Sequence, residues 1–275
     1  MIYGNRLSLS AYINGLLATG GVVFTAEQAE RALGVSHGAL LDAAEQMQHK
    51  GMLLSPRQGF YVVVPPQYAA WGAPPPTWYI DALMRYLGRP YYVGLLKAAQ
   101  LHGATHQAVM QFQVISNKQI PDIRAGRNLI SFYYRKDVMV VKAGIEDRKT
   151  DTGVMKVSSA ALTALDLLRY PRASGGLDNV VTVLADLGSA IDAEQLKALS
   201  LVTEKPVVQR LGYLLEALGY VAVVKPMHVA LQERGSVRWT ELDRQELFDP
   251  DLALPPLARD DRWKVIVRRV PEADQ

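Results

Sequence analysis

The sequence contains no cysteine, and this absence alone excludes disulfide bonds, thiolate nucleophiles and cysteine-ligated zinc. Long hydrophobic runs are missing as well, because no continuous apolar stretch reaches the length of about 18 residues that a membrane-spanning helix needs. The N-terminus also lacks a basic flank followed by an apolar core and a small-residue cleavage site. We therefore expect a soluble, cytoplasmic protein that has no membrane partner.

The chain also has little net charge for its length. Its 30 Lys and Arg residues face 27 Asp and Glu residues, and the formal charge of +3 is too small to argue for nucleic-acid binding by itself. The charges are unevenly spread, however. Residues 1–64 contain four basic and four acidic residues, residues 65–156 contain twelve and six, and residues 157–275 contain fourteen and seventeen. The basic surplus therefore lies in the middle third of the chain.

The basic residues of this middle third are candidates for contacts with nucleic-acid phosphates, because Lys and Arg supply the sequence-independent attraction to DNA. A solvated sheet edge that is rich in Lys and Arg explains the same residues equally well. The candidate phosphate-contacting residues are Lys118, Arg124, Arg127, Arg135, Lys136, Lys142, Arg148 and Lys149.

Residues 1–64 have the order of elements of a winged helix-turn-helix domain. Thr25 and Gln28 have the spacing of a capping box at the start of one helix. The turn Gly34-Val35-Ser36 follows, with a glycine that tolerates positive φ and a serine that can cap a second helix from His37 to Lys50. The apolar stripe that this second helix is predicted to bury consists of Leu40, Leu41, Ala44 and Met47.

Two apolar arms, Met52–Leu54 and Phe60–Val64, predict a hairpin that forms the wing. In such a domain the N-terminal end of the second helix reads bases, and the wing contacts the backbone or the minor groove. The outer face of the helix carries Asp42 and Glu45, which repel phosphates, so a winged helix that contacts only protein is the alternative. The candidate DNA-binding residues are Ser36, His37, Gly38, Lys50, Arg57 and Gln58.

A proline-rich linker over residues 65–76 is predicted to separate this domain from a larger one over residues 77–275. Helices are expected first in the larger domain, one capped by Thr77 and one after Pro90, then strands, then helices again. This order predicts an α+β fold, because it does not alternate strand and helix. The expected strands are Gln111–Ile115, Leu129–Tyr134, Val138–Val141, Val154–Val157 and Val221–Val224, with Arg135-Lys136-Asp137 at a hairpin tip.

Four stretches of the sequence resemble the AbiEi family of type IV antitoxins. They are FTAEQAERALGVSHGALLDAAEQMQHKGML (residues 24–53), YYVGLLKAAQLHGATHQ (91–107), VSSAALTALDLLRYPRASGGLDNVVTVLADL (157–187) and VVQRLGYLLEALG (207–219). The resemblance implies a winged-helix repressor domain followed by a mixed α/β antitoxin domain. It also implies that the protein binds inverted repeats in its own promoter, as double-stranded DNA, and neutralises a nucleotidyltransferase-like toxin encoded beside it, without a need for direct contact.

No set of residues has the spacing of a catalytic or metal site, so we expect no enzymatic activity, no cofactor and no metal. His102 and His106 are four residues apart, but no Glu completes an HExxH arrangement. Two alternatives stay open. The first is an enzyme in residues 77–275 with the winged helix as its regulatory domain, and the second is a stand-alone transcription regulator whose larger domain senses a ligand.

Overall fold

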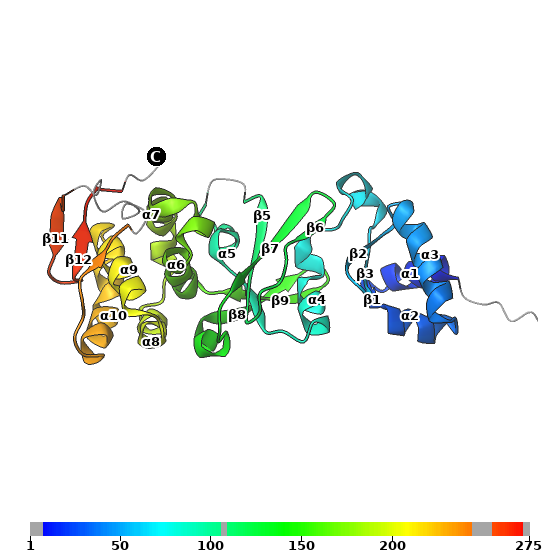
Figure 1. Ribbon diagram of the computed structural model, residues 1–275, viewed down its shortest axis with the longest axis horizontal. Coiled ribbons are helices and arrows are strands. Elements are labelled where there is room, and N and C mark those ends of the chain that lie inside the picture. Colours follow the sequence, from blue (N-terminus) through cyan, green and yellow to red (C-terminus); the bar gives the residue numbers. More distant parts are fainter. Residues whose placement is uncertain (1–7, 106–108, 244–254, 272–275) are drawn as a thin grey trace, which may run out of the picture. The chain divides into compact units, whose positions relative to one another are not determined.

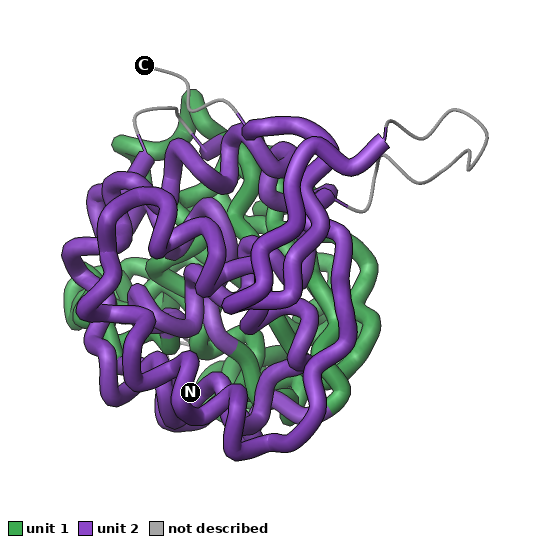
Figure 2. The backbone as a smooth tube through the Cα atoms, turned by 90° about the vertical axis from the view of Figure 1, so that its left-hand side faces the viewer, with its two compact units in different colours: residues 1–91, 110–136, 147–156 green, residues 92–109, 137–146, 157–275 purple. Residues whose placement is uncertain are grey.

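The computed structural model describes residues 8–105, 109–243 and 255–271. The chain forms two compact units (Figure 2). Unit 1 comprises residues 1–91, 110–136 and 147–156, and unit 2 comprises residues 92–109, 137–146 and 157–275. Each unit is therefore built from three separate segments of the chain. The domains expected from the sequence, residues 1–64 and 77–275 with a linker at 65–76, stay a prediction.

Residues 8–64 of unit 1 form a module of helices and short strands, which we call the N-terminal module. Its strands form an antiparallel sheet in the order β1-β3-β2, and Figure 1 shows the helices gathered beside this sheet. Phe24, Ala29 and Leu40 are each at most 1% exposed and lie in its core. In chain order the elements are α1 (Leu9–Ala18), β1 (Val23–Thr25), α2 (Ala26–Leu33), α3 (His37–His49), β2 (Leu53–Arg57) and β3 (Phe60–Val63).

Local hydrogen bonds fix the ends of α2 and α3 as the sequence predicts. The Thr25 hydroxyl accepts from the Gln28 backbone N–H at 3.2 Å, and the Gln28 side chain accepts from the Thr25 N–H at 2.8 Å, so the capping box is complete. Gly34 ends α2 with a φ of 63°, a left-handed conformation that suits glycine. The Ser36 hydroxyl then accepts from the Ala39 N–H and starts α3.

The rest of unit 1 begins with the proline-rich stretch, which forms two 3-10 turns, η1 (Pro66–Trp71) and η2 (Pro76–Trp78). A six-stranded sheet follows in the order β6-β7-β5-β4-β9-β8. The β5–β7 and β4–β9 pairs are parallel, whereas β6 and β7 form an antiparallel hairpin. The elements within unit 1 are α4 (Ile80–Tyr86), β5 (Gln111–Ser116), β6 (Ile123–Ala125) and β7 (Asn128–Tyr134). The strands β4 (Tyr91–Val93), β8 (Ile145–Thr150) and β9 (Gly153–Ser158) each include residues of both units.

Unit 2 is mainly helical and is centred on α6, in which every residue from 160 to 168 is buried. α6 packs against α5, α7, α8 and α9, so it forms the core of the unit. The elements are α5 (Leu95–Leu101), η3 (Met139–Gly144), α6 (Ala160–Arg169), η4 (Pro171–Ser174), α7 (Gly176–Leu187), η5 (Gly188–Ala190), α8 (Ala193–Val202), α9 (Lys205–Ala217), α10 (Val221–Glu233), β10 (Thr240–Glu241), β11 (Ala258–Asp260) and β12 (Val265–Val267). No helix in the described ranges is both long and apolar enough to cross a bilayer.

Two predicted strands are wrong. In the stretch Val138–Val141, Val138 precedes the 3-10 helix η3 and the other residues belong to it, and Val221–Val224 starts the helix α10. β-Branched residues favour strands only weakly, and the packing of α10 on α8 and α9 buries Val224 on a helical face instead. The predicted hairpin tip at Arg135 is wrong as well, because β7 pairs in parallel with β5 and the chain leaves the sheet after it.

Two predicted helix starts also differ from the structure. Thr77 lies inside η2, and α4 begins at Ile80 without a side-chain cap. The residues after Pro90 form the strand β4, and the helix α5 begins only at Leu95. A short apolar run such as Tyr91–Val93 has no period of its own, so only its pairing partner decides between helix and strand.

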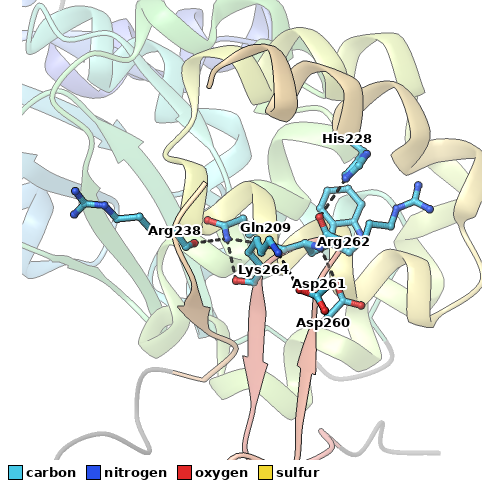
Figure 3. A network of polar contacts seen from close by, with 8 residues as sticks. Gln209, His228, Arg238, Asp260, Asp261, Arg262 and Lys264 are labelled. Carbon is cyan, nitrogen blue, oxygen red and sulfur yellow. Dashed lines mark hydrogen bonds and ion pairs between the residues drawn. The ribbon is translucent and has the colours of Figure 1, made fainter. Parts of the chain in front are cut away.

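The C-terminal strands form a small sheet, β10-β12-β11, that docks on α9 through buried polar side chains. Gln209, which is 1% exposed, donates to the carbonyls of Arg238, Trp263 and Lys264 at 2.9–3.1 Å. Figure 3 shows its side chain between the backbone segments that carry Arg238 and Lys264. Arg210 donates to the Glu241 carbonyl at 2.8 Å. The sheet is therefore joined to α9 at both of its parallel strands.

We expect Gly34→Ala to destabilise the protein by about 1 kcal/mol, because the left-handed conformation costs an alanine roughly 1–2 kcal/mol. Gly38→Ala is the matched control, since a Cβ at either glycine would meet no atom within 4 Å but only Gly34 has a positive φ. The control is expected to be neutral or slightly stabilising. Urea unfolding of both variants checks this, and equal midpoints for the two would contradict it.

A second prediction concerns Gly212 of α9, where a Cβ would lie 2.1 Å from a ring carbon of Trp263, a side chain that is 1% exposed. Gly212→Ala is expected to cost about 1–3 kcal/mol, since the indole must move out of a packed site. Gly15→Ala in α1 is the control, because nothing lies within 4 Å there. Thermal unfolding should show a lower midpoint for Gly212→Ala only.

Candidate nucleic-acid interface

The N-terminal end of α3 brings three of the predicted DNA-binding residues together at the surface. The Ser36 hydroxyl caps the helix, and the His37 side chain, 63% exposed, places Nδ1 at 2.6 Å from Glu30 Oε1 of α2. A carboxylate at this distance holds a proton on Nδ1, which leaves Nε2 to accept a hydrogen bond, or to donate one when the ring is charged. Gly38 is exposed, and a Cβ there would meet no atom within 4 Å. This end of the helix is therefore open to a groove.

The outer face of α3 is acidic and partly apolar. Asp42 and Glu45 are exposed, as the sequence predicts. Leu41 is predicted to be buried, but its side chain is 42% exposed. The buried stripe follows Leu40 and Ala44, and Leu41 is rotated by about 100° from it along the helix. The face therefore repels phosphates and offers an apolar side chain beside the carboxylates.

Lys50 is exposed at the C-terminal end of α3 and stands apart from the other candidates. α3 has 13 residues. At about 1.5 Å per residue, Lys50 is roughly 20 Å from Ser36. The structure therefore groups Ser36 with His37 and Gly38, and it does not bring Lys50 to the same end of the helix.

The predicted wing turn lies between β2 and β3, and side-chain contacts hold it. Arg57 donates from Nη2 to the Pro121 carbonyl at 2.6 Å and from Nη1 to the Pro56 carbonyl at 3.0 Å. Burial lowers the pKa of the Arg57 guanidinium. The Gln58 carbonyl accepts from the Tyr86 hydroxyl at 2.8 Å. Both predicted wing residues therefore contact other parts of unit 1.

The predicted basic residues lie at separate edges of the six-stranded sheet. Arg124 on β6 and Arg127 in the β6–β7 turn are at one edge, whereas Arg148 and Lys149 on β8 are at the other. All four are exposed. Five strand spacings of about 4.8 Å put roughly 24 Å between the two edges. One phosphate group therefore cannot contact both pairs.

The other basic candidates differ in exposure. Arg135 is 4% exposed and is not at the surface as expected. Lys118 and Lys136 are exposed in unit 1, and Lys142 is exposed on η3 in unit 2. Lys118 lies between β5 and the β6–β7 hairpin, so it is close in sequence to the sheet edge that carries Arg124.

Sequence reasoning missed Tyr86 and Pro121, the two residues that hold the wing turn. Their contacts join positions 28 and 64 residues apart, and no local pattern marks such pairs.

The structure does not test whether His102 and His106 lie together, because His106 is outside the described residues. His102 Nε2 is 2.8 Å from the Ser158 carbonyl. In the described part of the chain, no three His, Asp or Glu residues are grouped so that they could hold a metal ion.

The chain is similar to one protein family and to solved structures. The model of the AbiEi antitoxin C-terminal domain matches residues 92–217. No curated protein matches the chain. The crystal structure of the RV2827C protein from Mycobacterium tuberculosis is similar over 94% of this chain and 90% of that chain, with a TM-score of 0.66 and 17% sequence identity. At that identity the likeness shows a shared fold alone. The resemblance seen in the sequence is thus confirmed over residues 92–217, where the chain matches the C-terminal domain of AbiEi antitoxins.

Proposed function

We propose that this protein is a DNA-binding autorepressor and the antitoxin of a type IV toxin–antitoxin system. The match of residues 92–217 to the AbiEi antitoxin C-terminal domain is the observation that carries the antitoxin role. The protein acts in the cytoplasm on a nucleotidyltransferase-like toxin encoded beside it, by binding and not by catalysis. A type IV antitoxin does not need to touch its toxin, so we assign no toxin-contacting surface.

The repressor role rests on the N-terminal module, which we interpret as a winged helix-turn-helix. Its elements support this reading, because α2 and α3 are joined by a three-residue turn and are followed by the β2–β3 hairpin. In that fold the N-terminal residues of the second helix contact base edges. Ser36, His37 and Gly38 occupy these positions and are exposed. The ligand is double-stranded DNA that carries inverted repeats, in the promoter of the protein's own gene.

Affinity for DNA has to come from outside the N-terminal module, since residues 1–64 have no net charge and α3 has an acidic outer face. Arg124 and Arg127 belong to the same unit as α3, and β6 packs against β2 of the wing. We therefore assign phosphate contacts to this edge of the sheet first. Phosphate contacts set the position of the protein on DNA, and the end of α3 sets the sequence that it prefers.

We expect His37→Ala to weaken binding to the promoter fragment by about tenfold, because a lost base contact is worth roughly 1–3 kcal/mol. Binding to a scrambled fragment should not change. His49→Ala is the matched control, since His49 is exposed on the same helix and also lies near a glutamate, Glu45, at 3.7 Å. Titration of both fragments over a salt series measures this. Equal wild-type affinity for the two fragments would remove the case for a specific repressor.

The antitoxin role predicts that co-expression of this protein restores growth to cells that produce the toxin encoded by the neighbouring gene. His37→Ala should protect as well as the wild type, because the protective domain contains residues 92–217 and not α3. Growth curves with each variant measure this. Loss of protection by His37→Ala at unchanged protein level would show that protection acts through DNA binding instead.

A further inference from the structure

The end of β2 and the turn that follows it, residues 56–59, are held by contacts with three other elements of unit 1. The Arg57 guanidinium reaches the carbonyl of Pro121, in the loop before β6, at 2.6 Å. The Tyr86 hydroxyl, at the end of α4, donates to the Gln58 carbonyl at 2.8 Å. The Gly59 carbonyl accepts from the backbone N–H of Ala26, the first residue of α2, at 2.9 Å. Three separate elements therefore hold this turn.

The shape of the turn is matched to Tyr86. Gly59 has a φ of 74°, and a Cβ there would lie 2.7 Å from the Tyr86 hydroxyl oxygen. Phe60, 2% exposed, packs its ring 5.3 Å from the Tyr86 ring. The glycine therefore serves both a left-handed backbone and the close approach of the tyrosine.

The guanidinium of Arg57 already serves two carbonyls, those of Pro56 and Pro121. A hydrogen bond from a charged donor is stronger than one between neutral groups, and Arg57 is half-buried. A phosphate that took over the N–H group now bound to Pro121 would remove that anchor of the wing turn. The same loop runs from β5 to β6 and carries the exposed Lys118, and β6 carries Arg124.

We propose that Arg57 is a positioning residue, which with Tyr86 fixes the wing turn to the sheet and thereby sets the distance between α3 and the basic β6 edge. It does not itself contact DNA. Sequence preference then depends on a rigid spacing between base-reading residues and phosphate-contacting residues of one unit. This inference rests on the proposed repressor function, and it predicts effects that a phosphate-contacting arginine does not have.

The test compares Arg57→Met, Arg57→Lys and Tyr86→Phe, with Arg124→Met as a control for a phosphate contact. The first measurement needs no DNA: hydrogen exchange of the backbone amides of residues 53–63. Arg57→Met and Tyr86→Phe should both speed this exchange, by roughly tenfold and threefold, because each removes one anchor of the turn. Unchanged exchange in both variants would overturn the proposal.

The second measurement is affinity for the promoter fragment and for a scrambled fragment at several salt concentrations. Arg57→Met and Tyr86→Phe should weaken only promoter binding, with the salt dependence of the wild type. Arg57→Lys keeps the charge but only one of the two carbonyl contacts, so it should recover part of the promoter affinity. Arg124→Met should weaken binding to both fragments and reduce the slope of log K against log salt by about 0.9.

The opposite pattern would overturn the proposal. If Arg57→Met behaves like Arg124→Met, Arg57→Lys binds like the wild type and Tyr86→Phe has no effect, then Arg57 contacts phosphate directly. If the wild-type protein binds both fragments equally, the repressor function itself fails and the role in DNA reading fails with it. Hydrogen exchange would still decide whether Arg57 and Tyr86 hold the turn.

Discussion

Buried backbone carbonyl groups must be hydrogen-bonded, and in this protein long side chains from distant parts of the sequence supply donors where elements meet. Gln209 serves three carbonyls at the C-terminal sheet. Arg234 donates to two carbonyls at the end of α8, and Lys205 donates to three in the segment after α10. Arg57 also joins distant parts of the chain, through the carbonyl of Pro121, which is an exposed residue. Such a side chain joins elements that no secondary-structure hydrogen bond joins, so its loss also leaves acceptors without a donor.

The parts of the fold that the sequence predicts are those with short-range causes. Thr25 and Ser36 cap their helices as predicted, because a hydroxyl three residues before an amide needs no other part of the chain. The strand β4 escapes prediction because it has three residues and its partner β9 lies about 60 residues later. β6 also has only three residues, and β8 is mostly charged and exposed, so neither shows an apolar alternation. Val221 starts a helix for the same kind of reason: the packing of α10 on α8 and α9 outweighs a weak local preference.

The residues of the candidate site also differ in whether their causes are short-range or long-range. The exposed group Ser36, His37 and Gly38 follows from the cap and the turn alone, so the sequence places it well. Arg57 and Arg135 look alike in the sequence as cations near predicted turns, yet one is held by a carbonyl and the other is buried. Only long-range packing decides this, because a charged side chain has the same local pattern whether it faces solvent or another loop.

The contact between Gly212 and Trp263 bears on where the antitoxin domain ends. The family match stops at residue 217, the last residue of α9, whereas the face of α9 that carries Gly212 packs against Trp263, a residue outside the match. The Trp263 indole covers α9 at Gly212, and Gln209 of the same helix is also buried. Without the C-terminal segment, this face of α9 would be exposed to solvent. The end of the family match therefore separates α9 from the C-terminal strands that pack on it. We therefore expect a piece that folds as this domain to include the strands β10, β11 and β12.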